Sequence, residues 1–211
     1  GRDSDTGGQT QYVLELVKSL ANTSEVDQVD IVTRLIKDSK VDSSYSKEQE
    51  FIVPGARILR FQFGPNKYLR KELFWPYLDE LTQNLIQYYQ KHENKPSFIH
   101  AHYADAGYVG VRLSQALKVP FIFTGHSLGR EKRRKLLEAG LKINQIEKLY
   151  CISERINAEE ESLKYADIVV TSTKQESVSQ YSQYHSFSSE KSKVIAPGVD
   201  HTKFHHIHST T

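Results

Sequence analysis

The stretch that decides the fold is FIFTGHSLGREKRRK, residues 121–135. Its first four residues, 121–124, are typical of a short buried strand, and the charged run after them is typical of a helix at the surface. Short apolar runs recur at 98–102, 168–171 and 193–195, separated by residues that suit helices. Such alternation predicts an α/β fold in which helices cover both faces of a parallel sheet.

The first third of the chain extends this pattern. Residues 10–21 place apolar side chains on one helical face, and residues 29–33 have the composition of a strand. The polar, serine-rich residues 38–55 indicate a surface loop. A second strand is expected at 57–63, and a helix with one apolar face at 71–91.

Composition limits the classes of protein that need to be considered. The 211 residues are 38% hydrophobic, enough for one ordinary core, and the net charge of +2 favours neither a nucleic-acid nor a membrane partner. With Cys151 as its single cysteine and no apolar run of membrane-spanning length, the sequence predicts a soluble, disulfide-free protein of the cytoplasm. The chain begins at Gly1 and contains no methionine, which indicates a piece of a longer product.

In parallel α/β sheets, ligands bind beyond the carboxyl ends of the strands, so the segments at that edge are the candidate sites. One is DTGGQ, residues 5–9, at the head of the first helix. Gly7 and Gly8 let a ligand approach the backbone, and the free amides of a helix N-terminus favour phosphate. A simple turn before the helix explains the same residues equally well.

A second segment is HAHYADAG, residues 100–107. His100 and His102 alternate along a strand and therefore point to one face. A metal site needs further ligands, and the sequence has neither a cysteine pair nor a His-Glu helix motif, so we expect a polar pocket lining without metal. Gly107-x-x-Gly110 lacks the leading glycine of a dinucleotide fingerprint and does not indicate NAD.

The third segment, GHSLG at residues 125–129, matches the G-x-S-x-G elbow of serine hydrolases, with Ser127 as the nucleophile. Asp167 and His185 follow in the order of a triad. In such hydrolases, however, the helix after the elbow packs at the centre of the fold, and burying the five charged residues 130–134 there would be costly. An exposed basic helix at a strand end suits an anionic ligand better.

Blocks along almost the whole chain then identify a resemblance. The chain resembles the glucosyltransferase region of the sucrose-phosphate synthases, retaining enzymes with two facing Rossmann-like domains, the GT-B fold. The sucrose synthases share a similar DTGGQ segment but are not known for HSLGR, so the phosphate-using family is the closer match. The blocks are GRDSDTGGQTQYVLEL, VDIVTRLIKD, LRKELFWPYLDE, HAHYADAGYVG, TGHSLGREK, RINAEEESL, YADIVVTSTKQE and VIAPGVD.

The resemblance implies a domain organisation. Residues 1–200 would form the N-terminal, acceptor-binding domain of a GT-B enzyme, and residues 201–211, with four histidines, an exposed tail or the start of a linker. A nucleotide-sugar-binding domain absent from this chain would follow. In that fold the first, central strand lies just before the DTGGQ loop, and six residues precede Gly7, so we expect the sheet to lack this strand.

The resemblance also implies a reaction, the transfer of glucose with retention from UDP-glucose to the 2-hydroxyl of fructose 6-phosphate, giving sucrose 6-phosphate. No covalent enzyme intermediate, metal or other cofactor is implied. The Gly8 amide would face the diphosphate and His126 would position the glucose ring; a structural role for His126 is the alternative. A non-catalytic sugar-phosphate-binding domain remains a second class, and this chain by itself is expected to be inactive.

Seven residues are implied as contacts of fructose 6-phosphate. Lys71, Lys132 and Arg155 suit a phosphate dianion, whereas a lone lysine is more often a solvated charge; agreement among three separated cations favours a site. Polar groups such as Gln9 suit sugar hydroxyls. Where the family commonly has two adjacent arginines, Glu154 precedes Arg155, which places a carboxylate near the expected phosphate. The seven residues are Gly7, Gln9, Lys71, Tyr103, Ser127, Lys132 and Arg155.

Overall fold

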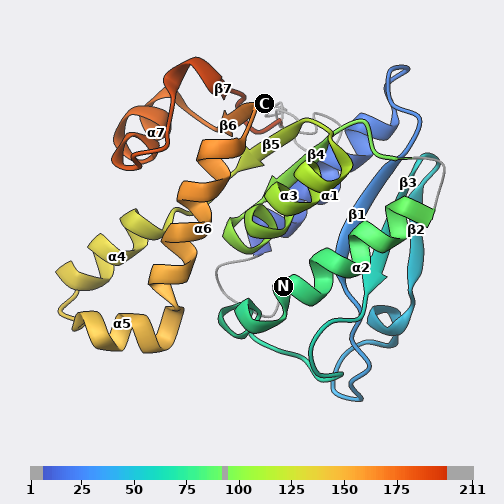
Figure 1. Cartoon of the computed structure of the whole chain (residues 1–211), viewed down its shortest axis with the longest axis horizontal. Coiled ribbons are helices and arrows are strands. Elements are labelled where there is room, and N and C mark those ends of the chain that lie inside the picture. Colours follow the sequence, from blue (N-terminus) through green and yellow to red (C-terminus); the bar gives the residue numbers. More distant parts are fainter. Residues whose placement is uncertain (1–6, 92–94, 199–211) are drawn as a thin grey trace, which may run out of the picture.

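A computed structural model describes residues 7–91 and 95–198 and shows an α/β protein in which strands and helices alternate (Figure 1). The strands are β1 (Val29–Arg34), β2 (Gln49–Val53), β3 (Ala56–Phe61), β4 (Ile99–His102), β5 (Phe121–Thr124), β6 (Ile168–Thr171) and β7 (Ser192–Val194). The α-helices are α1 (Gly7–Ala21), α2 (Leu78–Lys91), α3 (Ala104–Leu117), α4 (Gly129–Glu138), α5 (Ile143–Tyr150), α6 (Ile152–Tyr165) and α7 (Lys174–Ser179).

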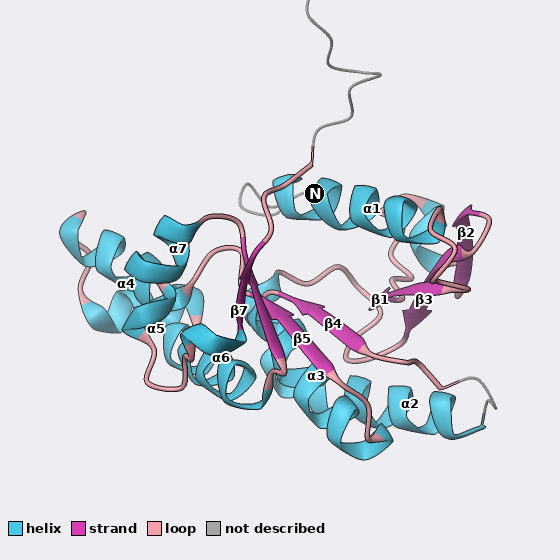
Figure 2. Ribbon diagram, turned by 90° about the horizontal axis from the view of Figure 1, so that it is seen from above, coloured by secondary structure: helices cyan, strands magenta, loops and turns pink. Residues whose placement is uncertain are grey.

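The strands form two sheets rather than the single sheet expected. One has three strands in the order β1-β3-β2, and the other has four parallel strands in the order β4-β5-β6-β7. Helix α1 lies on one side of the strands, and α2 and α3 lie on the other (Figure 2). The predicted α/β class with helices on both faces is confirmed, and the sheet is divided between β1 and β4.

The segment 38–55 was expected to be a loop, and this prediction is wrong for its second half. Strand β2 occupies Gln49–Val53 and pairs antiparallel with β3. The two strands are joined at Pro54-Gly55, where Gly55 has φ 77°. Proline followed by a glycine with positive φ is a common tight turn, so the three apolar residues before Pro54 belong to a hairpin.

The helix expected at 71–91 begins later than predicted. Short 3₁₀ turns occupy Lys71–Leu73 and Trp75–Tyr77, and the α-helix proper is Leu78–Lys91. Pro76 explains the difference, because its ring cannot donate a helical hydrogen bond and clashes with the preceding turn of an α-helix. The apolar face after Pro76 is as expected, with Leu78, Leu81 and Leu85 buried.

The core holds the carboxyl ends of β4 and β5 side by side. Phe121 and Phe123 of β5 are fully buried among residues of α3 and α6, and the register pairs His102 with Thr124. Immediately after these strand ends, Tyr103 has φ 84° and His126 has φ 58°. Positive φ is unfavourable for residues with a side chain and is frequent at functional sites.

Candidate functional site

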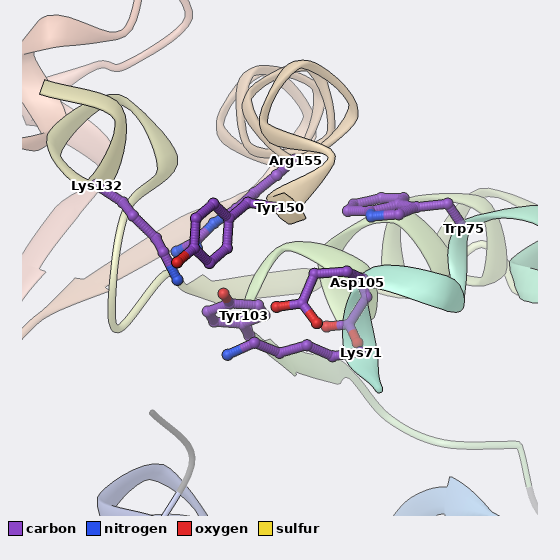
Figure 3. Close-up of a pocket in the computed structure, with 8 residues that line it drawn as sticks. Lys71, Trp75, Tyr103, Asp105, Lys132, Tyr150 and Arg155 are labelled. Atoms are coloured by element: carbon purple, nitrogen blue, oxygen red, sulfur yellow. The ribbon is translucent and has the colours of Figure 1, made fainter. Parts of the chain in front are cut away.

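A pocket lies beyond the carboxyl ends of β4 and β5, where several separate segments meet (Figure 3). Lys71 comes from the 3₁₀ turn Lys71–Leu73, Tyr103 follows β4, Lys132 lies in α4 and Arg155 lies in α6. The structure therefore brings together four of the seven expected acceptor residues. The complete lining is Lys71, Glu72, Trp75, Tyr103, Asp105, Lys132, Tyr150 and Arg155.

The cations of the pocket pack against tyrosine rings. Lys71 Nζ lies 5.0 Å from the centroid of the Tyr103 ring, and Arg155 Cζ lies 4.4 Å from the same centroid. Lys132 Nζ lies 4.3 Å from the ring centroid of Tyr150. Attraction between a cation and an aromatic face helps to hold these three side chains at the pocket.

Arg155 forms an ion pair with the buried carboxylate of Glu159. The side chain of Arg155 is 5% exposed, and Arg155 Nε donates to Glu159 Oε1 at 3.1 Å. Glu159 is fully buried and also accepts from the Gly129 amide, which begins α4. Arg155 Nη2 donates to the carbonyl and, at 3.3 Å, to the hydroxyl of Ser127. Ser127 thus joins the pocket residues through Arg155.

Two carboxylates, Glu72 and Asp105, also line the pocket, so the charge there is mixed. Burial raises the pKa of Asp105 from its usual value and favours its neutral form. Burial likewise raises the pKa of Tyr103, which remains a phenol able to donate a hydrogen bond. The pocket combines three cations with hydroxyl donors, the chemistry expected for a phosphate attached to a polar group.

Histidines form a second cluster beside the pocket. His102 Nδ1 and His126 Nε2 are 2.9 Å apart, and His100 Nε2 lies 2.9 Å from the Thr124 hydroxyl. The Tyr12 ring meets the His126 ring edge to face, with the centroids 5.2 Å apart. Figure 2 shows that α1, which carries Tyr12, lies across the strands from α3.

The histidine rings are neutral near pH 7. Burial is the main cause that lowers their pKa values, to about 4 for His100, about 2 for His102 and about 4 for His126. Since both rings are neutral, one of His102 and His126 donates and the other accepts in their contact. His126 is therefore oriented by a defined neighbour.

The glycine segment lies on the histidine side. Gly7 and Gly8 begin α1, and a Cβ built on Gly8 meets nothing within 4 Å, so a ligand has room to approach this backbone. Gln9 Nε2 donates to the His102 carbonyl at 3.2 Å. Gln9 is therefore separate from the lysine pocket and lies at the carboxyl end of β4.

Four lining residues were not predicted as site residues. Trp75 lies in the 3₁₀ turn Trp75–Tyr77, Tyr150 at the end of α5, Glu72 beside Lys71, and Asp105 in the first turn of α3. Aromatic residues at helix ends carry no local signal of a binding role. The WPYLDE block quoted above includes Trp75, but a block match does not separate a core residue from a lining residue.

The hydrolase interpretation of Ser127 is wrong. Asp167 Oδ2 accepts from the Phe121 amide at 2.8 Å, at the opposite end of β5 from Ser127. The His185 side chain is exposed, and the Ser127 hydroxyl contacts Arg155. Helix α4 lies at the surface with charged residues along it, as its composition predicts.

Other expectations concern metals and membranes. Within residues 7–91 and 95–198, no group of three or more His, Cys, Asp or Glu residues is arranged to hold a metal ion. In the same part of the chain, no helix is both long and apolar enough to span a bilayer. The expected tail 201–211 and its histidines lie outside the described residues.

The fold and the strand-end site define a GT-B glycosyltransferase domain. The structure matches a sucrose-phosphate synthase of Thermosynechococcus elongatus with a TM-score of 0.73 and 24% identity, over 95% of this chain and 45% of that one, a likeness of fold. A sequence model described as "Sucrose synthase first GT-B domain" matches residues 1–207, and the chain belongs to this family.

The curated relatives are named as sucrose-phosphate synthases. A probable sucrose-phosphate synthase of Vicia faba is 39% identical over 256 residues, 98% of this chain and 24% of its own length. The sucrose-phosphate synthase of Spinacia oleracea is 40% identical over 215 residues, 89% of this chain and 20% of its own length. The chain thus spans about a fifth to a quarter of the length of these relatives.

Proposed function

We propose that this chain is the acceptor-binding domain of a retaining glucosyltransferase that joins glucose from UDP-glucose to fructose 6-phosphate. One observation carries the proposal: Lys71, Lys132 and Arg155 come from three segments far apart in sequence and converge on one pocket. Three cationic donors from separate segments can surround a phosphate dianion. The names of the relatives support a sugar phosphate as the ligand.

The acceptor would lie with its phosphate among these cations. Tyr103 and Ser127 would contact the sugar hydroxyls from the ends of β4 and β5, and Gly7 and Gln9 would close the site from α1. This placement would leave the accepting 2-hydroxyl on the side of the histidine cluster, because Gln9, which would close the site, contacts the carbonyl of His102. A sugar phosphate would therefore bridge the two clusters.

The catalytic roles would fall to the second cluster. The open backbone at Gly8 would donate its amide to the departing diphosphate, which stabilises developing negative charge. His126, neutral and oriented by His102, would hydrogen-bond the glucose ring. The residues that grip UDP would belong to a second domain. This chain by itself would bind acceptor without turnover, which an assay with both substrates checks.

Binding of fructose 6-phosphate by the 211-residue chain tests the proposal. Lys132→Ala removes charge-assisted hydrogen bonds of roughly 1.5 to 3 kcal/mol, so affinity should fall roughly ten- to hundredfold in a calorimetric titration. Lys135→Ala is the matched control, since Lys135 lies on the same helix with a side chain 67% exposed. Affinity for unphosphorylated fructose should be unaffected by Lys132→Ala. An equal loss for both sugars would remove Lys132 from the phosphate site.

A further inference from the structure

The two glycines of the GHSLG segment, Gly125 and Gly129, have no role in the site proposed above. A Cβ built on Gly125 would lie 3.0 Å from the hydroxyl oxygen of Tyr181. A Cβ built on Gly129 would lie 2.9 Å from Glu159 Oε2. Polar side chains therefore approach the backbone closely at both ends of the segment. This close approach explains the two glycines without a nucleophile elbow.

The first end of the segment is fixed by Tyr181, in the 3₁₀ turn Tyr181–Gln183 that follows α7. The Gly125 amide donates to the Tyr181 hydroxyl at 2.8 Å. Tyr181 is fully buried, and its ring contacts that of Phe187 with the centroids 5.7 Å apart. Because a buried backbone amide needs an acceptor, this hydroxyl fixes the backbone immediately before His126.

The second end of the segment is fixed by Tyr184, a buried residue at the end of the same turn. The Arg130 amide donates to the Tyr184 hydroxyl at 3.0 Å, and this hydroxyl donates in turn to Glu159. Glu159 also accepts from the Gly129 amide at 2.8 Å and pairs with Arg155. The Tyr184 hydroxyl therefore contacts the carboxylate that holds Arg155 at the pocket.

The residues between the two ends belong to the two clusters of the site. His126 has φ 58°, in the left-handed region, and its Nε2 atom lies 2.9 Å from His102 Nδ1. A residue with a side chain keeps such a backbone conformation only where its surroundings impose it. The carbonyl of the next residue, Ser127, accepts from Arg155. The two tyrosines thus flank a strained segment that contacts both clusters.

We propose that Tyr181 and Tyr184 are positioning residues with separate tasks. Tyr181 sets the backbone before His126 and thereby the orientation of the His126 ring. Tyr184 sets the carboxylate of Glu159 and thereby the direction of Arg155. The inference rests on the proposed function for what His126 and Arg155 do, and on the geometry alone for how they are held.

Removal of one hydroxyl at a time tests the inference in the 211-residue chain. The variants are Tyr181→Phe and Tyr184→Phe, and Tyr165→Phe is the matched control, because Tyr165 is 43% exposed at the end of α6. NMR of the ring nitrogens of His126 measures the ratio of its two tautomers, which depends on its hydrogen bond. The exchange of the Arg155 Nε–H proton with solvent measures the pairing of the guanidinium.

The two signals should respond in a crossed pattern. Tyr181→Phe should change the ratio of the His126 tautomers and leave the exchange of Arg155 Nε–H as in the original chain. Tyr184→Phe should speed this exchange about tenfold and leave the His126 tautomers unchanged. A general loss of structure would change both signals in both variants, and that result overturns the inference. A variant that leaves its own signal unchanged overturns the role of that tyrosine.

Binding of fructose 6-phosphate separates this inference from the proposed function. Tyr184→Phe should bind about tenfold more weakly than the original chain in a calorimetric titration, and Tyr181→Phe should bind equally well. If Tyr184→Phe also binds with the original affinity, its role at the phosphate is overturned. If the original chain does not bind fructose 6-phosphate, the proposed function fails, and the crossed pattern still decides whether the tyrosines hold His126 and Arg155.

Amide exchange in the original chain replaces any variant that does not fold. The amides of Gly125 and Arg130 should exchange as slowly as those of β5, because each donates to a buried hydroxyl. Such protection supports the inference. Exchange at the rate of an open surface loop overturns it.

Discussion

Acidification should destabilise this domain through its three clustered histidines. In the folded chain the pKa values are about 4 for His100, about 2 for His102 and about 4 for His126. In the unfolded chain each ring has a pKa of about 6.5. Below that value the unfolded chain binds protons that the folded chain does not, so the free energy of unfolding falls as the pH drops from 6.5 toward 4. Above pH 6.5 this contribution to stability is fully present.

The size of the loss in stability follows from the difference between the pKa of each histidine in the folded chain and its pKa in the unfolded chain. Each pH unit inside the window costs about 1.4 kcal/mol for each histidine that stays neutral when folded. Between pH 6.5 and pH 5 one such ring therefore costs roughly 1.6 kcal/mol. Small domains unfold at a cost of roughly 5 to 15 kcal/mol, so the loss from even one ring is measurable.

Urea unfolding at pH 7 and pH 5 measures this loss. In His102→Gln the free energy of unfolding should fall by about 2 kcal/mol less than in the original chain over this interval. His185→Gln is the control, because the His185 ring is exposed at the surface. If the original chain and His102→Gln lose the same stability on acidification, His102 does not stay neutral in the fold and the reasoning fails.

Two further predictions concern the packing that supports the pocket. Glu159→Gln leaves the buried guanidinium of Arg155 unpaired and should cost roughly 3 to 5 kcal/mol in urea unfolding, whereas Glu138→Gln, at an exposed pair, should change stability by less than about 1 kcal/mol. Gly107→Ala places a Cβ 2.3 Å from Ser162 Oγ and should cost roughly 1 to 3 kcal/mol. Gly8→Ala should leave the free energy of unfolding unchanged, because a Cβ at Gly8 meets no neighbouring atom within 4 Å. Thermal unfolding of both variants measures the difference. A melting temperature that is lowered by Gly8→Ala and unchanged by Gly107→Ala would contradict the packing described.

Local signals predicted most of the elements. The apolar runs 121–124 and 168–171 became β5 and β6 with the predicted bounds, because a strand buried on both faces leaves a continuous apolar run. The errors at β2 and at the start of α2 came from turn chemistry that was not weighed. Pro54-Gly55 ends β2, and Pro76 delays α2, and both signals are present in the sequence.

The site was less accessible to local reasoning. A lysine in a charged helix, such as Lys132, has the sequence pattern of a solvated surface residue. Lys132 was predicted as a site residue because of the family resemblance and not because of its position in the helix. The contact between His102 and His126 depends on the register in which His102 pairs with Thr124, a property of two strands together. Glu159 is an ordinary helical residue by sequence, and its role under Arg155 follows from the approach of α4 to α6.

The departure from the family pattern at Glu154 has a simple consequence in this geometry. Glu154 and Arg155 are adjacent in the first turn of α6, and neighbouring residues of a helix point about 100° apart. Arg155 is buried against Tyr103, whereas Glu154 is exposed. A carboxylate in the first turn is favourable to the helix dipole. The expected conflict between Glu154 and a bound phosphate therefore does not follow from adjacency in sequence, since the cation that faces the pocket is Arg155.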